Sequence, residues 1–169
     1  MRSPIALVTV LMLVALMVGG AVLCSPAAFA LERAGTVVAV RGKVEVDREG
    51  ARSRLRVKDP IYVVDTIYTN NGRVQLMFSD HSLVSLGRNT VLTVSEYRYR
   101  PQAGEGALKT RVTEGVFRVV GGAITRLAPE NFTTETPTAT IGIRGSMYSG
   151  IYRNQTLSVL FEGGRGIFV

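Results

Sequence analysis

Residue types that perform acid–base chemistry meet at one place in this sequence, Asp80-His81-Ser82. Aspartate, histidine and serine are the components of a hydrolytic triad, in which histidine removes the serine proton and aspartate orients the histidine. Neighbouring side chains of an extended segment point to opposite faces, and those of a turn face solvent, so these three cannot align. We therefore interpret His81 as a turn residue and expect no catalytic residue.

Metal ligation and cofactor binding have equally little support. His81 is the only histidine and Cys24 the only cysteine, which excludes a zinc site of the ordinary type. The aspartates are too dispersed for a calcium loop, at Asp47, Asp59, Asp65 and Asp80. The glycine-rich run at 163–166 lacks the lysine and the helix of a phosphate-binding loop. We expect no metal, no cofactor and no enzymatic activity.

Candidate binding residues begin with a run of alternating basic side chains. They are Arg52, Arg54, Arg56 and Lys58. If residues 52–58 are extended, these side chains share one face over roughly 20 Å, with Leu55 on the opposite face. Such a cationic stripe would bind an anionic polymer or a membrane surface. The alternative is an edge strand that its basic side chains protect from aggregation.

A second alternation, Tyr97-Arg98-Tyr99-Arg100, places Tyr97 and Tyr99 on one face of a strand. Tyrosines spaced in this way can stack on sugar rings, because they offer apolar faces with a polar tip. The alternative is a packing face that simply covers the sheet.

The third candidate is the segment Thr136, Pro137, Thr138, Ala139, Thr140, Ile141, Gly142, Ile143, Arg144, Gly145 and Ser146. A period of two places Ala139, Ile141 and Ile143 on the core side and Gly142 and Arg144 on the other. The glycine leaves the backbone uncovered, so another segment can approach closely beside the arginine. Arg144 then either pairs with a carboxylate in a packed interior strand or contacts a ligand.

Strands must position these residues, because a hydrophobic period of two runs through nearly the whole chain and no convincing helix is found. The predicted strands cover residues 36–40, 44–46, 73–78, 83–86, 91–100, 108–112 and 115–120. The sequence Asn70-Asn71-Gly72 is a hairpin signal before residues 73–78. Turns about ten residues apart predict an all-β sandwich, barrel or solenoid.

Residues 1–30 have the pattern of an export signal. Arg2 supplies a positive region, residues 5–23 are almost entirely apolar, and Ala28-Phe29-Ala30 is a small-x-small cleavage site. We expect a signal peptide cleaved after Ala30, leaving residues 31–169 as one β domain. One alternative is an uncleaved membrane anchor, since the apolar run approaches the length of a bilayer span. The other is lipidation at Cys24, although Leu23 precedes it where that signal requires a small residue.

The formal net charge is +7, and removal of residues 1–30, whose one charged side chain is Arg2, leaves +6. Because the chain carries the pattern of an export signal, we expect no nucleic-acid partner. The expected partners are an envelope protein or an anionic glycan or lipid. The alternative is that the charge serves solubility alone.

Four segments together resemble the FecR-domain family of β-rich periplasmic modules. They are residues 35–37 with 42–44, 59–62 with 65–69, 74–82, and 136–146. The family usually has glycine where this chain has Lys58 and His81, and threonine in place of Ser146. The resemblance implies a β-solenoid-like or β-sandwich-like single domain.

FecR-type membrane regulators hold a sigma factor with a cytoplasmic domain, for which the four residues before the apolar run leave no room. We therefore expect a stand-alone, non-catalytic recognition or assembly module of the bacterial envelope, periplasmic or exported, with a possible part in envelope signalling. One alternative is a structural envelope component that binds anionic polysaccharide or surface material. The other is a signal-transducing regulator anchored in the inner membrane, with membrane association only if residues 5–23 are retained.

Overall fold

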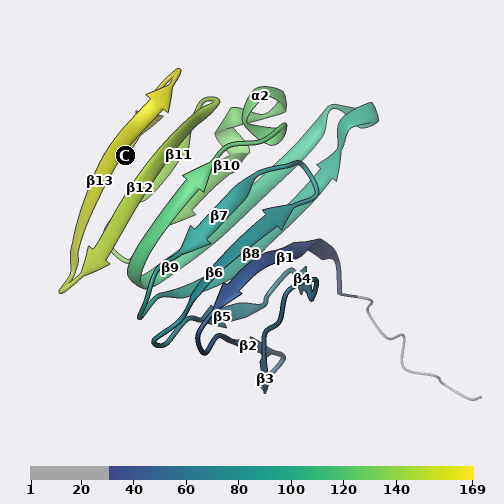
Figure 1. Ribbon diagram of the computed structural model, residues 1–169. Helices are drawn as coiled ribbons and strands as arrows, with labels where there is room; N and C mark the ends of the chain where they lie inside the picture. Colours follow the sequence, from purple (N-terminus) through teal and green to yellow (C-terminus); the bar gives the residue numbers. More distant parts are fainter. Residues whose placement is uncertain (1–30) are drawn as a thin grey trace, which may run out of the picture. The chain divides into compact units, whose positions relative to one another are not determined.

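Strands account for most of residues 31–169, the part of the chain that the computed structural model describes (Figure 1). The segment expected to be a signal peptide or anchor, residues 1–30, lies outside the described residues. The described helical segments are short: η1 (Pro101–Ala103), α2 (Ile124–Leu127) and η2 (Pro129–Asn131). The all-β prediction is therefore confirmed, although it contained none of these three short helical segments.

One group of strands, here called the front layer, surrounds the second half of the long strand β9 (Glu105–Val120). On one side of β9 lie β7 (Leu83–Leu86), β6 (Arg73–Phe78), β1 (Arg33–Arg41) and β4 (Pro60–Tyr62), in that order. On the other side lie β12 (Ser146–Arg153) and β13 (Thr156–Gly164). All of these neighbours pair antiparallel.

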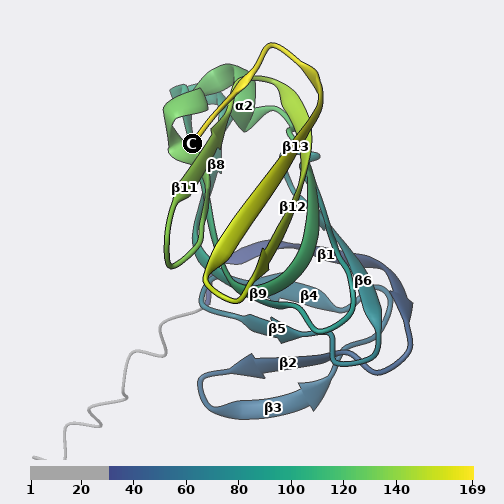
Figure 2. The ribbon, with the colours of Figure 1, turned by 90° about the vertical axis from the view of Figure 1, so that its left-hand side faces the viewer.

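The other group, here called the rear layer, surrounds the first half of β9. On one side lie β8 (Val91–Arg100), β5 (Thr66–Tyr68), β2 (Glu45–Arg48) and the edge strand β3 (Ala51–Arg54). On the other side lie β10 (Phe132–Glu135), β11 (Thr140–Ile143) and β14 (Ile167–Phe168). Among the described strands, β9 and β10 form the one parallel pair. Figure 2 shows β12 and β6 on one side of the domain and β8 and β11 on the other.

The passage of β9 between the layers depends on Thr90 and Gly115. Gly115 has φ +109°, and a Cβ there would lie 2.4 Å from the Cα of Thr90, so only glycine fits. The buried Thr90 hydroxyl accepts a hydrogen bond from the Val116 N–H at 3.0 Å and donates one to the Val116 carbonyl at 3.1 Å. One side chain thus satisfies the backbone groups that the bend removes from the ladder.

A single core fills the space between the layers. It includes Leu76 and Val119 from the front layer and Val94 and Ile141 from the rear layer, all at most 1% exposed. Antiparallel layers that share one core favour the sandwich over the solenoid alternative. The predicted boundaries are nearly correct, except that residues 108–112 and 115–120 form one continuous strand, β9.

The hairpin prediction at Asn70–Gly72 is wrong. This turn joins β5 in the rear layer to β6 in the front layer, and the two strands do not pair. The local signal correctly marks a tight turn, but β5 pairs with β2 and β8, and β6 pairs with β1 and with the strand that follows it, β7.

A buried ion pair fixes the start of β5. Asp65 is fully buried, and its carboxylate accepts hydrogen bonds from Nε and Nη2 of Arg48, at 2.7 and 2.8 Å. Its Oδ2 also accepts the Tyr62 N–H at 2.9 Å, and the guanidinium lies 4.3 Å from the centre of the Tyr62 ring. The hydrogen bond from Arg48 to Asp65 raises the pKa of Arg48. Asp65 is therefore a structural carboxylate.

Candidate anion-binding site

The segment from Thr136 to Ser146 contains a turn, a short strand and a second turn. The Thr136 N–H and hydroxyl both donate to the Ala139 carbonyl, at 2.8 and 3.0 Å, so Pro137 lies in a turn after β10. The extended part is only β11, where Ile141 and Ile143 are fully buried. The predicted alternation therefore holds from residue 140 to residue 143.

Arg144 does not pair with a carboxylate in the interior, which is a correction to one of the two expectations for it. Its side chain is exposed, and no carboxylate of residues 31–169 lies within 4.0 Å of it. The reason is that β11 ends at Ile143, so Arg144 already belongs to the turn that leads into β12. The close approach expected at Gly142 is present, because the Phe168 ring covers that glycine.

Ser146 holds the turn of Arg144 against the turn between β13 and β14. Its hydroxyl donates to the Gly166 carbonyl at 2.7 Å and accepts the Gly166 N–H at 2.9 Å. The Arg144 N–H donates to the same carbonyl at 3.1 Å. These bonds bring Arg165, the neighbour of Gly166, to the same place as Arg144. A threonine at position 146 has the same hydroxyl, so this departure from the family pattern keeps the contact.

A third arginine, Arg126, comes from α2, and the buried Asp80 anchors that helix. The Asp80 Oδ2 accepts the Ile124 N–H at 3.2 Å and the Ser82 hydroxyl at 2.6 Å, while Oδ1 accepts the Ser82 N–H at 3.1 Å. The Ser82 hydroxyl also accepts the Gly122 N–H at 2.9 Å. A Cβ on Gly122 would lie 2.3 Å from the Asp80 carbonyl oxygen, so the close contact requires glycine. The carboxylate and hydroxyl of the triad-like sequence thus both form structural hydrogen bonds that hold α2.

The three arginines line one cavity of about 550 Å³, which also contacts Thr125 and Pro129. No acidic side chain lines this cavity. Within residues 31–169, none of the three guanidinium groups lies within 4.0 Å of a carboxylate. Three positive charges around one cavity repel each other, and an anion bound among them would remove that repulsion.

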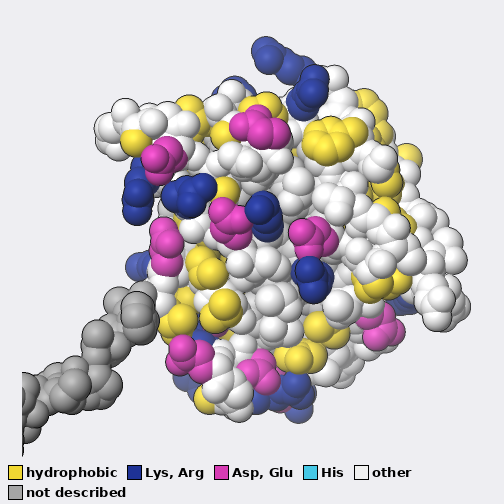
Figure 3. Space-filling model, turned by 180° about the vertical axis from the view of Figure 1, so that it is seen from behind, with side chains coloured by type: hydrophobic (Ala, Val, Ile, Leu, Met, Phe, Trp, Pro, Cys, Tyr) yellow, Lys and Arg dark blue, Asp and Glu magenta, His cyan; other side chains and the backbone are white. Residues whose placement is uncertain are grey.

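The outer face of the rear layer shows the opposite arrangement, with positive and negative side chains interspersed (Figure 3). Its ion pairs are Lys109–Glu96, Arg98–Glu96, Arg98–Glu105, Arg100–Glu105 and Arg111–Glu135. On the front layer, Arg118 pairs with Glu162 at 2.8 Å, and this hydrogen bond lowers the pKa of Glu162. These strand arginines are thus compensated by glutamates, whereas the three arginines of the cavity are not.

The cavity can bind a phosphate, sulfate or carboxylate group. A guanidinium offers a planar fork of donors that matches two oxygens of such a group. Three forks from three different segments can contact different oxygens of one group at once. The volume lies within the range of ordinary ligand pockets, so it can also hold part of the molecule that carries the group.

The cationic stripe is shorter than predicted. Only Arg52 and Arg54 lie on a strand, β3, because the chain turns after Leu55 and Lys58 has φ +75°. The Asp59 carboxylate makes this turn by accepting the Arg56 N–H at 2.7 Å. All four basic side chains are exposed, and β3 is an edge strand, as the protective alternative requires. The Arg52 guanidinium lies 4.0 Å from the centre of the Tyr68 ring.

The two tyrosines of β8 belong to the core side of the strand. Tyr97 is 4% exposed and its ring lies 5.6 Å from that of Phe78, while Tyr99 is partly buried against the same core. The Tyr97 hydroxyl accepts the Asp80 N–H at 3.0 Å. Burial, with the nearby Asp80 charge, raises the pKa of Tyr97 to about 12. A ring buried in this way cannot stack on a sugar, so the packing alternative describes Tyr97.

Two of the cavity residues, Arg126 and Arg165, were not among the predicted sites. The sequence holds one signal for the pair Arg144 and Arg165, because each is followed by a glycine, Gly145 and Gly166, with positive φ. An Arg-Gly repeated at two turns marks arginines on tight, exposed loops. No comparable signal exists for Arg126, whose position depends on the contact of α2 with Asp80.

Residues 31–169 contain no cluster of three or more His, Cys, Asp or Glu side chains able to hold a metal ion. Within the same residues, no helix has the length and apolar character needed to cross a membrane.

Comparison with known proteins gives one family and one solved structure. The family described as "FecR protein" matches residues 65–164. A solved structure described as "Cell surface anchoring domain" is similar with 27% sequence identity, over 36% of this chain and 82% of its own, at a TM-score of 0.34. No curated protein matches the chain.

Proposed function

Because the chain belongs to the FecR protein family, we propose that it is a non-catalytic envelope module that binds an anionic group of its partner in the cavity of Arg126, Arg144 and Arg165. The group is a phosphate, sulfate or carboxylate carried by an envelope protein, glycan or lipid. Binding of this kind serves recognition or assembly, and in a signalling setting it reports the presence of the partner.

One observation carries the proposal: three arginines from three separate segments line a cavity that has no acidic side chain. Arg98, Arg100, Arg111 and Arg118, in contrast, are each paired with a glutamate on the outer faces of the two layers. The buried Asp80 network and the Ser146 hydroxyl position two of the segments. Such positioning of unpaired donors is typical of a binding site built before its ligand arrives.

The cellular setting of the proposal rests on residues 1–30. Their pattern supports export to the periplasm or cell envelope, and export makes nucleic acid an unsuitable partner. Retention of residues 5–23 as an anchor would give a regulator in the inner membrane instead. The N-terminus of the protein isolated from its host distinguishes them: a start at Leu31 supports the exported form, and an intact N-terminus supports the anchored one.

The cavity is tested with titration calorimetry of residues 31–169 against pyrophosphate and citrate, at low and at high salt. We expect binding that weakens with salt, and a loss of about tenfold or more for Arg126→Ala, Arg144→Ala or Arg165→Ala, since a charge-assisted hydrogen bond contributes about 1.5–3 kcal/mol. Arg144→Lys should lose part of the affinity, because it keeps the charge and loses the fork. Arg153→Ala is the matched control, an exposed arginine of β12 outside the cavity.

Equal losses for Arg153→Ala and Arg144→Ala would mean that net charge alone attracts the probe, and would refute the site. Absence of binding by both probes at low salt would refute it as well.

A second candidate function is attachment to an anionic polysaccharide along the edge strand β3. Its support is that Arg52 and Arg54 alternate on an exposed edge, with Arg56 and Lys58 exposed on the turn that follows. Replacement of Arg52, Arg54 and Arg56 by serine should then abolish retention on an anionic glycan column and leave pyrophosphate binding unchanged. If the variant is retained on the column as well as the unmodified domain, the edge strand does not bind the glycan, and its basic side chains have only the protective role.

A further inference from the structure

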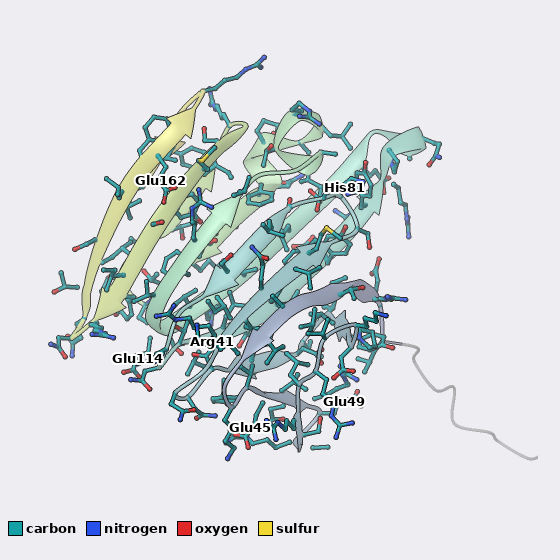
Figure 4. The ribbon with its side chains drawn as sticks, in the orientation of Figure 1. Arg41, Glu45, Glu49, His81, Glu114 and Glu162 are labelled. Atoms are coloured by element: carbon teal, nitrogen blue, oxygen red, sulfur yellow. The ribbon has the colours of Figure 1, made fainter. Side chains whose placement is uncertain are left out.

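A second group of unpaired arginines lies at the other end of the front-layer strands. Arg41 ends β1, where Figure 4 shows it at the lower end of the strand, and Arg73 begins the adjacent β6. The two are directly paired in the strand register. Arg88 lies in the turn after β7, and all three side chains are exposed. They line a cavity of about 360 Å³ together with Gly42 and Asn71.

The backbone holds these turns together. The Asn89 N–H donates to the Asn70 carbonyl at 2.6 Å, and the Thr69 N–H donates to the Thr90 carbonyl at 3.0 Å. The turn that carries Arg88 is thereby fixed to the turn that precedes Arg73. Within residues 31–169, none of the three guanidinium groups lies within 4.0 Å of a carboxylate. Glu114 is at the same end of the sheet (Figure 4) but does not line the cavity.

A mostly apolar groove of about 360 Å³ continues from this cavity across the outer face of the front layer, and Arg41 and Arg73 line both. Four small residues lie along it: Ala39 of β1, Ser85 of β7, Gly87 just after β7, and Ser149 of β12. The strand register explains the depression, since Ala39, Gln75, Ser85, Arg118 and Ser149 form one continuous row across five strands. Val40 and Val116 supply apolar surface at the end nearest the arginines.

We propose that this groove and the three arginines form one site for a single-chain anionic amphiphile. The phosphate or carboxylate head binds Arg41, Arg73 and Arg88, and the hydrocarbon chain lies in the groove over Ala39, Ser85 and Gly87. The two parts of the site match the two parts of such a ligand. The three unpaired arginines attract a negatively charged group, and the apolar groove favours a hydrocarbon chain. The site shares no residue with the cavity of Arg126, Arg144 and Arg165, so it stands or falls separately from the proposed function.

The test is titration of residues 31–169 with monomeric dodecyl phosphate, with dodecyl maltoside for the chain without charge and butyl phosphate for the charge with a short chain. We expect dodecyl phosphate to bind at least about tenfold more tightly than either control, because only it fills both parts. Arg73→Ala and Arg88→Ala should each weaken binding about tenfold. Ala39→Phe, which adds a ring on an exposed strand position, should remove the advantage of the long chain.

Arg126→Ala is the matched control and should leave dodecyl phosphate binding unchanged. Thermal unfolding of each variant shows that it is folded, and Arg73→Lys provides a milder change if Arg73→Ala does not fold. Equal affinity for dodecyl phosphate and either control ligand would overturn the proposal. Loss of binding in Arg126→Ala, or full binding in Ala39→Phe or Arg73→Ala, would overturn it too.

Discussion

Replacement of Asp80 by asparagine should destabilise the domain by about 2–4 kcal/mol. Three donors converge on the Asp80 carboxylate: the N–H and hydroxyl of Ser82 and the N–H of Ile124. Asparagine has one acceptor oxygen where aspartate has two, so its NH2 group must face at least one of these donors. One buried N–H or O–H without a partner costs about 1–3 kcal/mol, and the remaining bonds lose their charge assistance. Removal of a buried negative charge offsets part of this cost, which is why the expected value is not higher.

The assay is urea unfolding of residues 31–169, followed by thermal unfolding, where the expected loss corresponds to roughly 10 °C. His81→Asn is the matched control, since it changes the exposed neighbour in the same turn and asparagine tolerates positive φ. Because Ile124 begins the helix that carries Arg126, the Asp80 variant should also bind pyrophosphate more weakly, though less so than Arg126→Ala. A loss of stability below about 1 kcal/mol, with full pyrophosphate affinity, would refute the role of Asp80 as the anchor of α2.

Three further changes test the turns and the core. Thr90→Val should lower the free energy of unfolding by about 1–3 kcal/mol, because the Val116 N–H loses its hydrogen-bond partner. Thr90→Ser keeps the hydroxyl and should lower it by less than about 1 kcal/mol. Urea unfolding measures both values, and equal losses would exclude the hydroxyl as the cause. Position 81 has φ +65°, where glycine is less strained than histidine, so His81→Gly should raise the free energy of unfolding by about 0.5–1 kcal/mol. Gly104→Ala, at φ +69°, should lower it by about 1 kcal/mol for the same reason. No gain in stability for His81→Gly would mean that residue 81 bears little strain. The pKa of Tyr97 in the folded domain, about 12, lies above its ordinary 10.0. The stability gained by burying the protonated hydroxyl is therefore complete below pH 10. It is lost as the pH rises from 10 to 12, by up to about 1.4 kcal/mol per pH unit. Tyr97→Phe should make alkaline unfolding less steep, and an unchanged pH profile would contradict the assignment.

Much of the fold could be predicted from the sequence, because a strand with one buried face shows alternating apolar and polar residues. Val74, Leu76 and Phe78 were expected to point inward and are at most 3% exposed. Pairing could not be predicted in the same way. The turn at Asn70–Gly72 has the local sequence of a hairpin, but β5 pairs with β2 and β8, and β6 pairs with β1 and with the following strand β7. Only the competition among all strands for the common core decides between them.

The candidate site was partly visible for a related reason. Arg144 was singled out beside a glycine that permits close approach, and the structure confirms the approach by Phe168. The expected carboxylate partner was wrong because the predicted strand included Arg144, whereas β11 ends one residue earlier, so the arginine lies in a turn and not on a strand face. Arg126 could not be found, since its place depends on a helix of one turn held by the buried Asp80.

Two positions at which this chain departs from the family pattern keep the backbone conformation that glycine would adopt there. Lys58 and His81 stand where the family has glycine, and both have positive φ, at +75° and +65°. The chain thus keeps the turn conformation although lysine and histidine disfavour it. Hydrogen bonds around each position determine the turn: that of the Arg56 N–H to Asp59 around position 58, and the Asp80–Ser82 network around position 81. Of the two exposed arginine clusters, Arg88, Arg144 and Arg165 lie on turns that hydrogen bonds to other segments hold in place. Binding specificity in this domain should therefore change by substitution at these turns, and least on the outer face of the rear layer, where Arg98, Arg100, Lys109 and Arg111 are paired with glutamates.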